Sequence, residues 1–95
     1  MISTVVLTTS ANAAYAWYTC TVNTVGTYGS TVYINLTDTG GNFSNRNFIP
    51  YTGQENRQMA TALTALSNDF FVIIYADYNL SQASRKLYYF GISVP

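Results

Sequence analysis

Few residues of this chain have side chains that catalyse reactions or bind metal ions. The sequence contains no histidine, which is the commonest general base and a frequent zinc ligand. The carboxylates of Asp38, Glu55 and Asp69 are far apart in the sequence, and each lies where a turn or a helix end is expected. We therefore predict that the protein is not an enzyme and that it uses no metal ion and no cofactor.

Cys20 is the one cysteine among the 95 residues, so no disulfide bond can form within this sequence. It lies in a run with the pattern of a β-strand. We interpret it as a small, buried apolar residue, and the alternative is a reactive or intermolecular thiol.

The neutral side chains are suited to a different chemistry. Aromatic rings stack on the C–H faces of sugars, while amides and hydroxyls form hydrogen bonds with sugar hydroxyls. We predict Trp17, Tyr33 and Asn35 as ligand-binding residues, because alternation places them on the outward faces of two paired strands. The alternative is that Trp17 and Tyr33 form a cross-strand aromatic pair, which stabilises a hairpin or fills a subunit interface.

Charge is scarce in this sequence. Only 8% of the residues are charged, against about 25% in typical proteins, and the net charge is zero. Such a chain lacks the positive field that nucleic-acid binding requires, and it has little repulsion to oppose self-association. The apolar fraction of 48% indicates a folded domain, and no apolar run approaches the roughly 20 residues that span a membrane. We predict no binding to nucleic acid and no membrane insertion.

The elements that must position these residues are mostly strands. Residues 11–14 have the small side chains of a signal cleavage site, but residues 1–10 lack a basic residue and a long apolar stretch. We expect residues 4–9 to form a first strand. Alternation of apolar residues predicts four more strands, at residues 15–25, 32–37, 70–78 and 86–94.

The connections between these strands differ in kind. Residues 26–30 form a glycine-containing hairpin loop, and residues 42–51 look irregular. A helix is predicted over residues 53–67, where Thr52 and Glu55 match a capping box. The large apolar residues that recur along its expected core face are Met59, Leu63 and Leu66.

This order of elements predicts a mostly β fold in one domain, residues 1–95. We expect a small OB-like, partly open antiparallel β-barrel with one helix between the third and fourth strands. The strand at residues 70–78 is apolar on both faces, and a small barrel buries only one of them. We predict that the other face is an oligomer interface, formed by Phe71, Ile73, Tyr75 and Asp77.

Asp77 is the polar member of that set. Its position in the alternation suggests an ion pair with an arginine across the interface or a polar contact with a ligand. The alternative is plain exposure to solvent.

The layout resembles that of the OB-fold B subunits of bacterial AB5 toxins of the pertussis and subtilase-cytotoxin type. The resemblance covers about residues 17–92. It depends on three segments: the aromatic and proline-containing segment before the helix, Asn47-Phe48-Ile49-Pro50; the helix from Met59 to Leu66; and the strand Phe71-Val72-Ile73-Ile74-Tyr75. It implies a secreted protein that forms a pentameric ring, binds glycans on host cells and serves a catalytic A-type partner chain.

Two functions follow as hypotheses. The first is a non-catalytic, glycan-binding, homo-oligomeric module for attachment to cell surfaces. The second is a structural subunit of an extracellular filament or surface layer, in which the tyrosine-rich faces serve only for assembly.

Overall fold

The computed structural model describes residues 15–93. The expected strand at residues 4–9 lies outside the described residues. In chain order the elements are β1 (Ala16–Tyr28), β2 (Thr31–Asp38), β3 (Arg46–Pro50), α1 (Glu55–Asn68), β4 (Phe71–Ala76), the 3-10 helix η2 (Gln82–Ser84), β5 (Lys86–Leu87) and β6 (Tyr89–Ser93).

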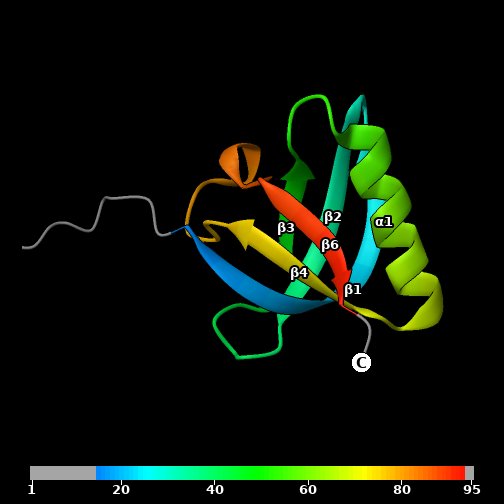
Figure 1. Ribbon diagram of the computed structural model, residues 1–95. Helices are drawn as coiled ribbons and strands as arrows, with labels where there is room; N and C mark the ends of the chain where they lie inside the picture. The colour runs from blue at the N-terminus through cyan, green and yellow to red at the C-terminus, as the bar shows by residue number, and fades with distance from the viewer. Residues whose placement is uncertain (1–14, 94–95) are drawn as a thin grey trace, which may run out of the picture.

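The strands form one curled sheet in the order β5-β3-β2-β1-β4-β6. All neighbouring pairs are antiparallel except β3 and β5, which are parallel. Only Tyr88 separates β5 from β6, so the last part of the chain covers both edges of the sheet and nearly closes a barrel (Figure 1). The predicted mostly β barrel, with its helix between the third and fourth strands, is confirmed.

The hairpin of β1 and β2 is tighter than expected. The strands extend to Tyr28 and Thr31, so the turn contains only Gly29 and Ser30, and Gly29 has the positive φ of 61° that such a turn requires. The pairing register shifts between Val22 and Thr24, which leaves Asn23 as the extra residue of a β-bulge.

The segment that we expected to be irregular, residues 42–51, contains β3. Its residues do alternate, because Phe48 and Pro50 are buried while Asn47 and Ile49 are half-buried. The pattern is short and interrupted by polar residues, and a proline usually indicates the end of a strand. Here Pro50 is the last residue of β3, a position that strands tolerate.

The start of α1 differs from the predicted capping box. Its N-cap is Gln54, which makes no side-chain capping bond. The Thr52 hydroxyl instead accepts a hydrogen bond from Lys86 Nζ (3.0 Å). Glu55 does reach back, since its Oε1 accepts from the Gly53 N–H (3.0 Å). The helix ends where Asp69 turns into the left-handed region and its N–H bonds to the Ala65 carbonyl.

The predicted core face of the helix is wrong for Leu63 and Leu66, which are 47% and 37% exposed. Met59, the third residue of that predicted face, is partly buried and packs against the core. The residues that do face the barrel are Gln58, Ala62 and Ala65. Two alanines allow the helix backbone to approach the sheet closely, which leaves no room for leucines on that face. Gln58 satisfies its amide by donating to the Leu87 carbonyl (2.9 Å).

The core lies inside the barrel. The largest fully buried side chains are Phe48, Ile34, Leu36, Ile74, Leu87, Val72 and Cys20. The two faces of β4 are as predicted: Val72, Ile74 and Ala76 are buried, whereas Phe71 is exposed and Ile73 and Tyr75 are half-buried. No helix within residues 15–93 has both the length and the apolar character of a membrane span.

The buried face can be tested by two truncations. Leu63→Ala should lower the free energy of unfolding by less than about 1 kcal/mol, because about half of the residue's surface is already in solvent. Ile74→Ala should cost about 2–5 kcal/mol, because Ile74 is fully buried. Denaturant titration measures both values. Equal costs would show that Leu63, rather than Ala62, faces the barrel.

Candidate functional site

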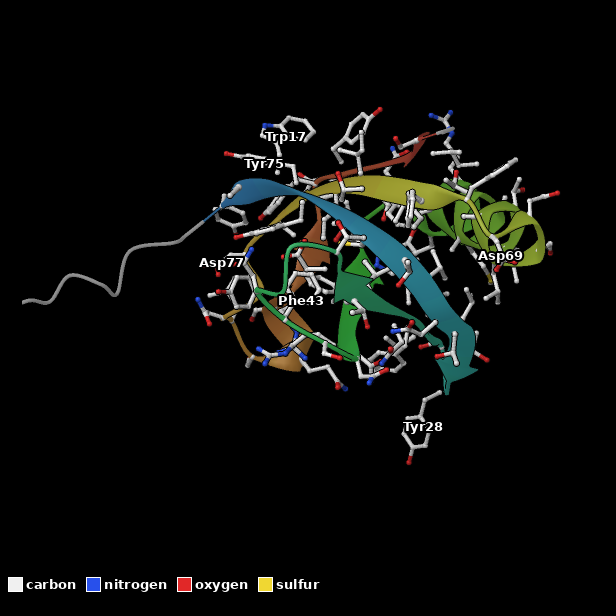
Figure 2. All side chains as sticks on the ribbon, turned by 90° about the horizontal axis from the view of Figure 1, so that it is seen from below. Trp17, Tyr28, Phe43, Asp69, Tyr75 and Asp77 are labelled. Atoms are coloured by element: carbon white, nitrogen blue, oxygen red, sulfur yellow. The ribbon has the colours of Figure 1, made fainter. Side chains whose placement is uncertain are left out.

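The structure separates the three predicted ligand-binding residues. In the β1–β2 pairing, Tyr33 lies opposite Gly26 and Asn35 lies opposite Thr24. Trp17 lies on the other half of β1, where its partner is Tyr75 of β4. The cross-strand pair of Trp17 and Tyr33 is therefore wrong. Figure 2 shows Trp17 and Tyr75 together at the opposite end of the molecule from Tyr28, the last residue of β1.

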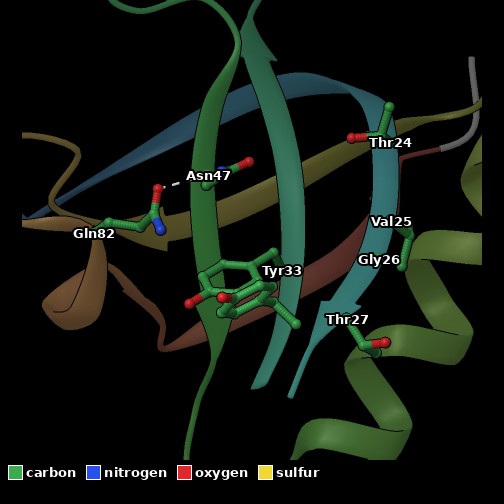
Figure 3. Close-up of a pocket in the computed structure, with 8 residues that line it drawn as sticks. Thr24, Val25, Gly26, Thr27, Tyr33, Asn47 and Gln82 are labelled. Atoms are coloured by element: carbon green, nitrogen blue, oxygen red, sulfur yellow. Dashed lines mark hydrogen bonds between the residues drawn. The ribbon is translucent and has the colours of Figure 1, made fainter. Parts of the chain in front are cut away.

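Tyr33 belongs to an open groove of about 540 Å³ on the outer surface of β1, β2 and β3 (Figure 3). Opposite Tyr33, nothing lies within 4 Å of the position that a Cβ atom on Gly26 would occupy. The absence of a side chain there leaves the groove open beside the Tyr33 ring. All its lining residues are uncharged: Thr24, Val25, Gly26, Thr27, Tyr28, Tyr33, Asn47 and Gln82.

A row of amide side chains runs across the three strands beside this groove. Asn23 Nδ2 donates to Asn35 Oδ1 (2.9 Å), and Asn35 Nδ2 donates to Asn47 Oδ1 (2.8 Å). Asn47 Nδ2 in turn donates to Gln82 Oε1 (3.2 Å), the bond drawn in Figure 3. Each bond fixes the orientation of the next amide, so Asn47 and Gln82 are held in place at the groove wall.

The amide row extends the predicted site. Asn35 lies in the row behind the groove, whereas Asn47 and Gln82 line the groove itself. Sequence reasoning missed both lining residues because residues 42–51 and 79–85 were interpreted as connections. A usable signal was present: Asn23, Asn35 and Asn47 are outward-facing residues on three successive strands, which pair side by side in a meander.

Trp17 belongs to a second surface, which we call the outer aromatic face. Its ring centroid lies 4.9 Å from that of Tyr75 and 5.4 Å from that of Tyr89. Trp17 is 60% exposed, so the stacking does not bury it. The face spans β1, β4 and β6 and the residues next to them, and it comprises Tyr15, Trp17, Phe71, Ile73, Tyr75, Tyr88 and Tyr89.

A glycine supports this face. Gly91 lies two residues after Tyr89 on β6, and a Cβ atom on Gly91 would lie 2.6 Å from the Tyr89 hydroxyl oxygen. The Tyr89 side chain thus lies over the bare backbone of Gly91. Any larger residue at that position would push the ring away.

Asp77 does not share this face with Phe71, Ile73 and Tyr75. It is 2% exposed, and β4 ends one residue before it, at Ala76. The alternation on which the prediction depended stops where the strand stops. One carboxylate oxygen of Asp77 accepts from the Asn79 N–H (2.9 Å), a bond that stabilises the turn after β4.

Most of the basic groups are engaged within the protein. Arg46 Nη1 donates to the Tyr78 carbonyl (2.9 Å), and Arg85 Nε donates to the Asn47 carbonyl (2.7 Å). Burial, and secondarily the nearby charge of Arg46, lowers the pKa of the Arg85 guanidinium. These bonds tie the segment that follows β4 to β3. Among residues 15–93 no cluster of three or more His, Cys, Asp or Glu residues is placed to bind a metal ion.

Comparisons with protein-family models, with curated proteins and with solved structures found no match for this chain. The resemblance to toxin B subunits therefore stays a prediction.

Cys20 is a free cysteine with a buried side chain. Burial, with a smaller contribution from the charge of Asp38, raises the pKa of its thiol from 9.0 to about 12. A thiolate is the reactive form, so this environment is that of a structural cysteine.

We expect Cys20 to resist a thiol reagent at about pH 8 in the folded protein and to react after denaturation. Because the folded-state pKa is the higher one, the contribution of this thiol to stability is complete below about pH 9 and is lost as the pH rises towards 12. Absorbance of the released reagent reports one site, since the sequence has one cysteine. Rapid labelling of the native protein would contradict the assignment.

Proposed function

We propose that this protein is a non-catalytic glycan-binding module that acts as a homo-oligomer. The observation that carries the proposal is the uncharged groove in which the Tyr33 ring lies beside an ordered row of amides. A pyranose offers the complementary chemistry: a C–H face for the ring, and hydroxyls that both donate to and accept from amides.

The order of the amide row favours this ligand class. The Asn47 and Gln82 amides are positioned by protein bonds before any ligand arrives, which reduces the entropy lost on binding. An uncharged lining gives no advantage to phosphates or other strong anions. It also predicts that binding is almost independent of salt, since no counterions are released.

The outer aromatic face supports the homo-oligomer. Tyr75 lies between Trp17 and Tyr89 on three paired strands, and Ile73 and Phe71 continue the same face along β4. Their cross-strand neighbours are small residues: Thr19 and Thr21 on β1, and Gly91 and Ser93 on β6. Exposed apolar patches of this kind commonly mark protein–protein contacts. Trp17 therefore joins the proposed interface, and Asp77 leaves it, because its side chain is buried in the turn.

The layout resemblance extends the proposal to a secreted bacterial protein, a pentameric ring and a catalytic A-type partner chain. The second candidate is the structural subunit of a filament or layer. It uses the same aromatic face but gives no role to the groove. A ring has closed symmetry and a filament has an open contact, so electron micrographs of the purified protein distinguish the two.

A glycan array should give selective hits that persist in moderate salt. With a monovalent hit, Tyr33→Ala should weaken binding about tenfold or more, because the stacking ring is lost. Gly26→Leu should weaken it similarly by filling the groove, which has open space at that position. Titration followed by NMR measures both effects.

Trp17→Ala is the matched aromatic control, and it should leave monovalent binding unchanged, because Trp17 lies on the other surface. If Trp17→Ala abolished monovalent binding and Tyr33→Ala did not, the sugar site would be on the aromatic face. An array without hits, obtained with an intact oligomer, would favour the structural subunit.

The oligomer makes a separate prediction. Light scattering coupled to size exclusion, at micromolar concentration, should give a mass several times that of the 10.5 kDa chain. Ile73→Asp should reduce the mass, because it places a charge in the centre of the apolar face. Thr24→Asp adds the same charge on the groove side and should not change it. A wild-type monomer would refute the oligomer.

A further inference from the structure

A second groove, of about 440 Å³, lies between the first turns of α1 and the start of β6. It shares no lining residue with the Tyr33 groove. Its walls combine four aromatic rings, two amides, a hydroxyl and one guanidinium, from Tyr51, Gln54, Arg57, Gln58, Thr61, Tyr88, Tyr89 and Phe90.

Arg57 differs from the other basic residues of the chain. Arg46 and Arg85 donate to backbone carbonyls, and Lys86 donates to the Thr52 hydroxyl. In the part of the chain that the structure describes, the Arg57 guanidinium has no hydrogen-bond or ion-pair partner. It is exposed at a groove whose lining contains no acidic residue. The groove thus offers a positive charge with five donors and no internal counterion.

The aromatic wall beside Arg57 is held in place by several bonds. The Tyr51 N–H donates to Gln58 Oε1 (3.3 Å), and the Tyr51 carbonyl accepts from the Gln54 N–H (2.9 Å). The ring centroid of Tyr51 lies 5.0 Å from that of Tyr88. Tyr88 is anchored in turn, since its N–H donates to the Tyr75 carbonyl (3.1 Å). A flat ligand would therefore meet a preformed aromatic surface.

We propose that this groove binds a ligand in which a carboxylate is attached to a ring. The carboxylate would accept two parallel hydrogen bonds from the Arg57 guanidinium, and the ring would pack on Tyr51 and Tyr88. The charge of Arg57 makes a neutral ring a poorer ligand than its acid. This site is distinct from the Tyr33 groove in location, charge and ligand class. It shares Tyr88 and Tyr89 with the outer aromatic face, so self-association through that face would compete with ligand binding here, and the probes are compared in the Ile73→Asp variant.

Two pairs of probes test the proposal and identify the kind of ring. Benzoate and benzamide share an aromatic ring, but only benzoate carries a negative charge. Glucuronate and glucose share a pyranose ring, but only glucuronate carries a negative charge. We expect at least one of the two acids to bind saturably, with a dissociation constant of about 1–10 mM, as suits so small a ligand. Its neutral counterpart should bind at least about fivefold more weakly. NMR shifts should map to Arg57, Tyr51 and Tyr88.

Variants at two exposed positions, Arg57 and Tyr51, and at the half-buried Lys86 complete the test. Arg57→Gln should weaken binding of the acid about tenfold, because it removes the charge but keeps a long helix-forming side chain. Lys86→Gln is the matched control: it removes the same charge from a residue outside this groove, and it should leave binding unchanged. Tyr51→Leu should weaken binding of the acid by removing the ring.

Three results would overturn the inference. They are an absence of saturable binding for both acids at this groove, equal binding of each acid and its neutral counterpart as reported by the shifts of Arg57 and Tyr51, and equal losses in Arg57→Gln and Lys86→Gln. None of these results affects the sugar groove, which is measured with neutral glycans and with Tyr33→Ala. Failure of one site is therefore distinguishable from failure of the other.

Discussion

The rest of the structure depends on the way in which β1 bends. This strand pairs with β4 along its first part and with β2 along its last, and Cys20 and Thr21 pair with both neighbours. A straight strand could not follow both partners around a barrel this small. The bulge at Asn23 supplies the bend, and it also turns Asn23 and Thr24 to the outside together. Asn23 then begins the amide row, and Gly26 comes to lie opposite Tyr33.

The bend also explains why one strand serves two surfaces. Before the bulge, β1 contributes Trp17 to the outer aromatic face. After it, Thr24 and Gly26 line the Tyr33 groove. Alternation correctly placed Trp17 and Tyr33 on outward faces. It could not show that their positions along the sheet differ, because alternation gives the face of a residue but not its cross-strand partner.

What could be predicted from the sequence is the face of a strand on which a residue lies, and what could not is its partner on another element. The faces of β4 were predictable, because Val72, Ile74 and Ala76 keep one period throughout the strand. The position of the helix was predictable, but the face that it turns to the barrel was not. The helix packs so closely on the sheet that the small Ala62, and not Leu63, faces the barrel, and this distance is set by the folded barrel. Contacts made by groups distant in sequence, such as Asn47 with Gln82, became visible only once the chain had folded.

The two main surfaces depend on each other in the proposed function. An open, uncharged groove holds a single sugar weakly, because it encloses little of the ligand and offers no ion pair. Linking several such sites in one assembly raises the overall affinity by about 10²–10⁴-fold without any new contact. The outer aromatic face lies on a part of the barrel away from the groove, so self-association through it leaves the groove accessible. A glycan binder with this groove therefore needs the oligomer, whereas a purely structural subunit would need only the aromatic face. The amide row joins β1, β2, β3 and Gln82 in either function, and only the proposed glycan binder would give the amides of Asn47 and Gln82 a ligand in the groove.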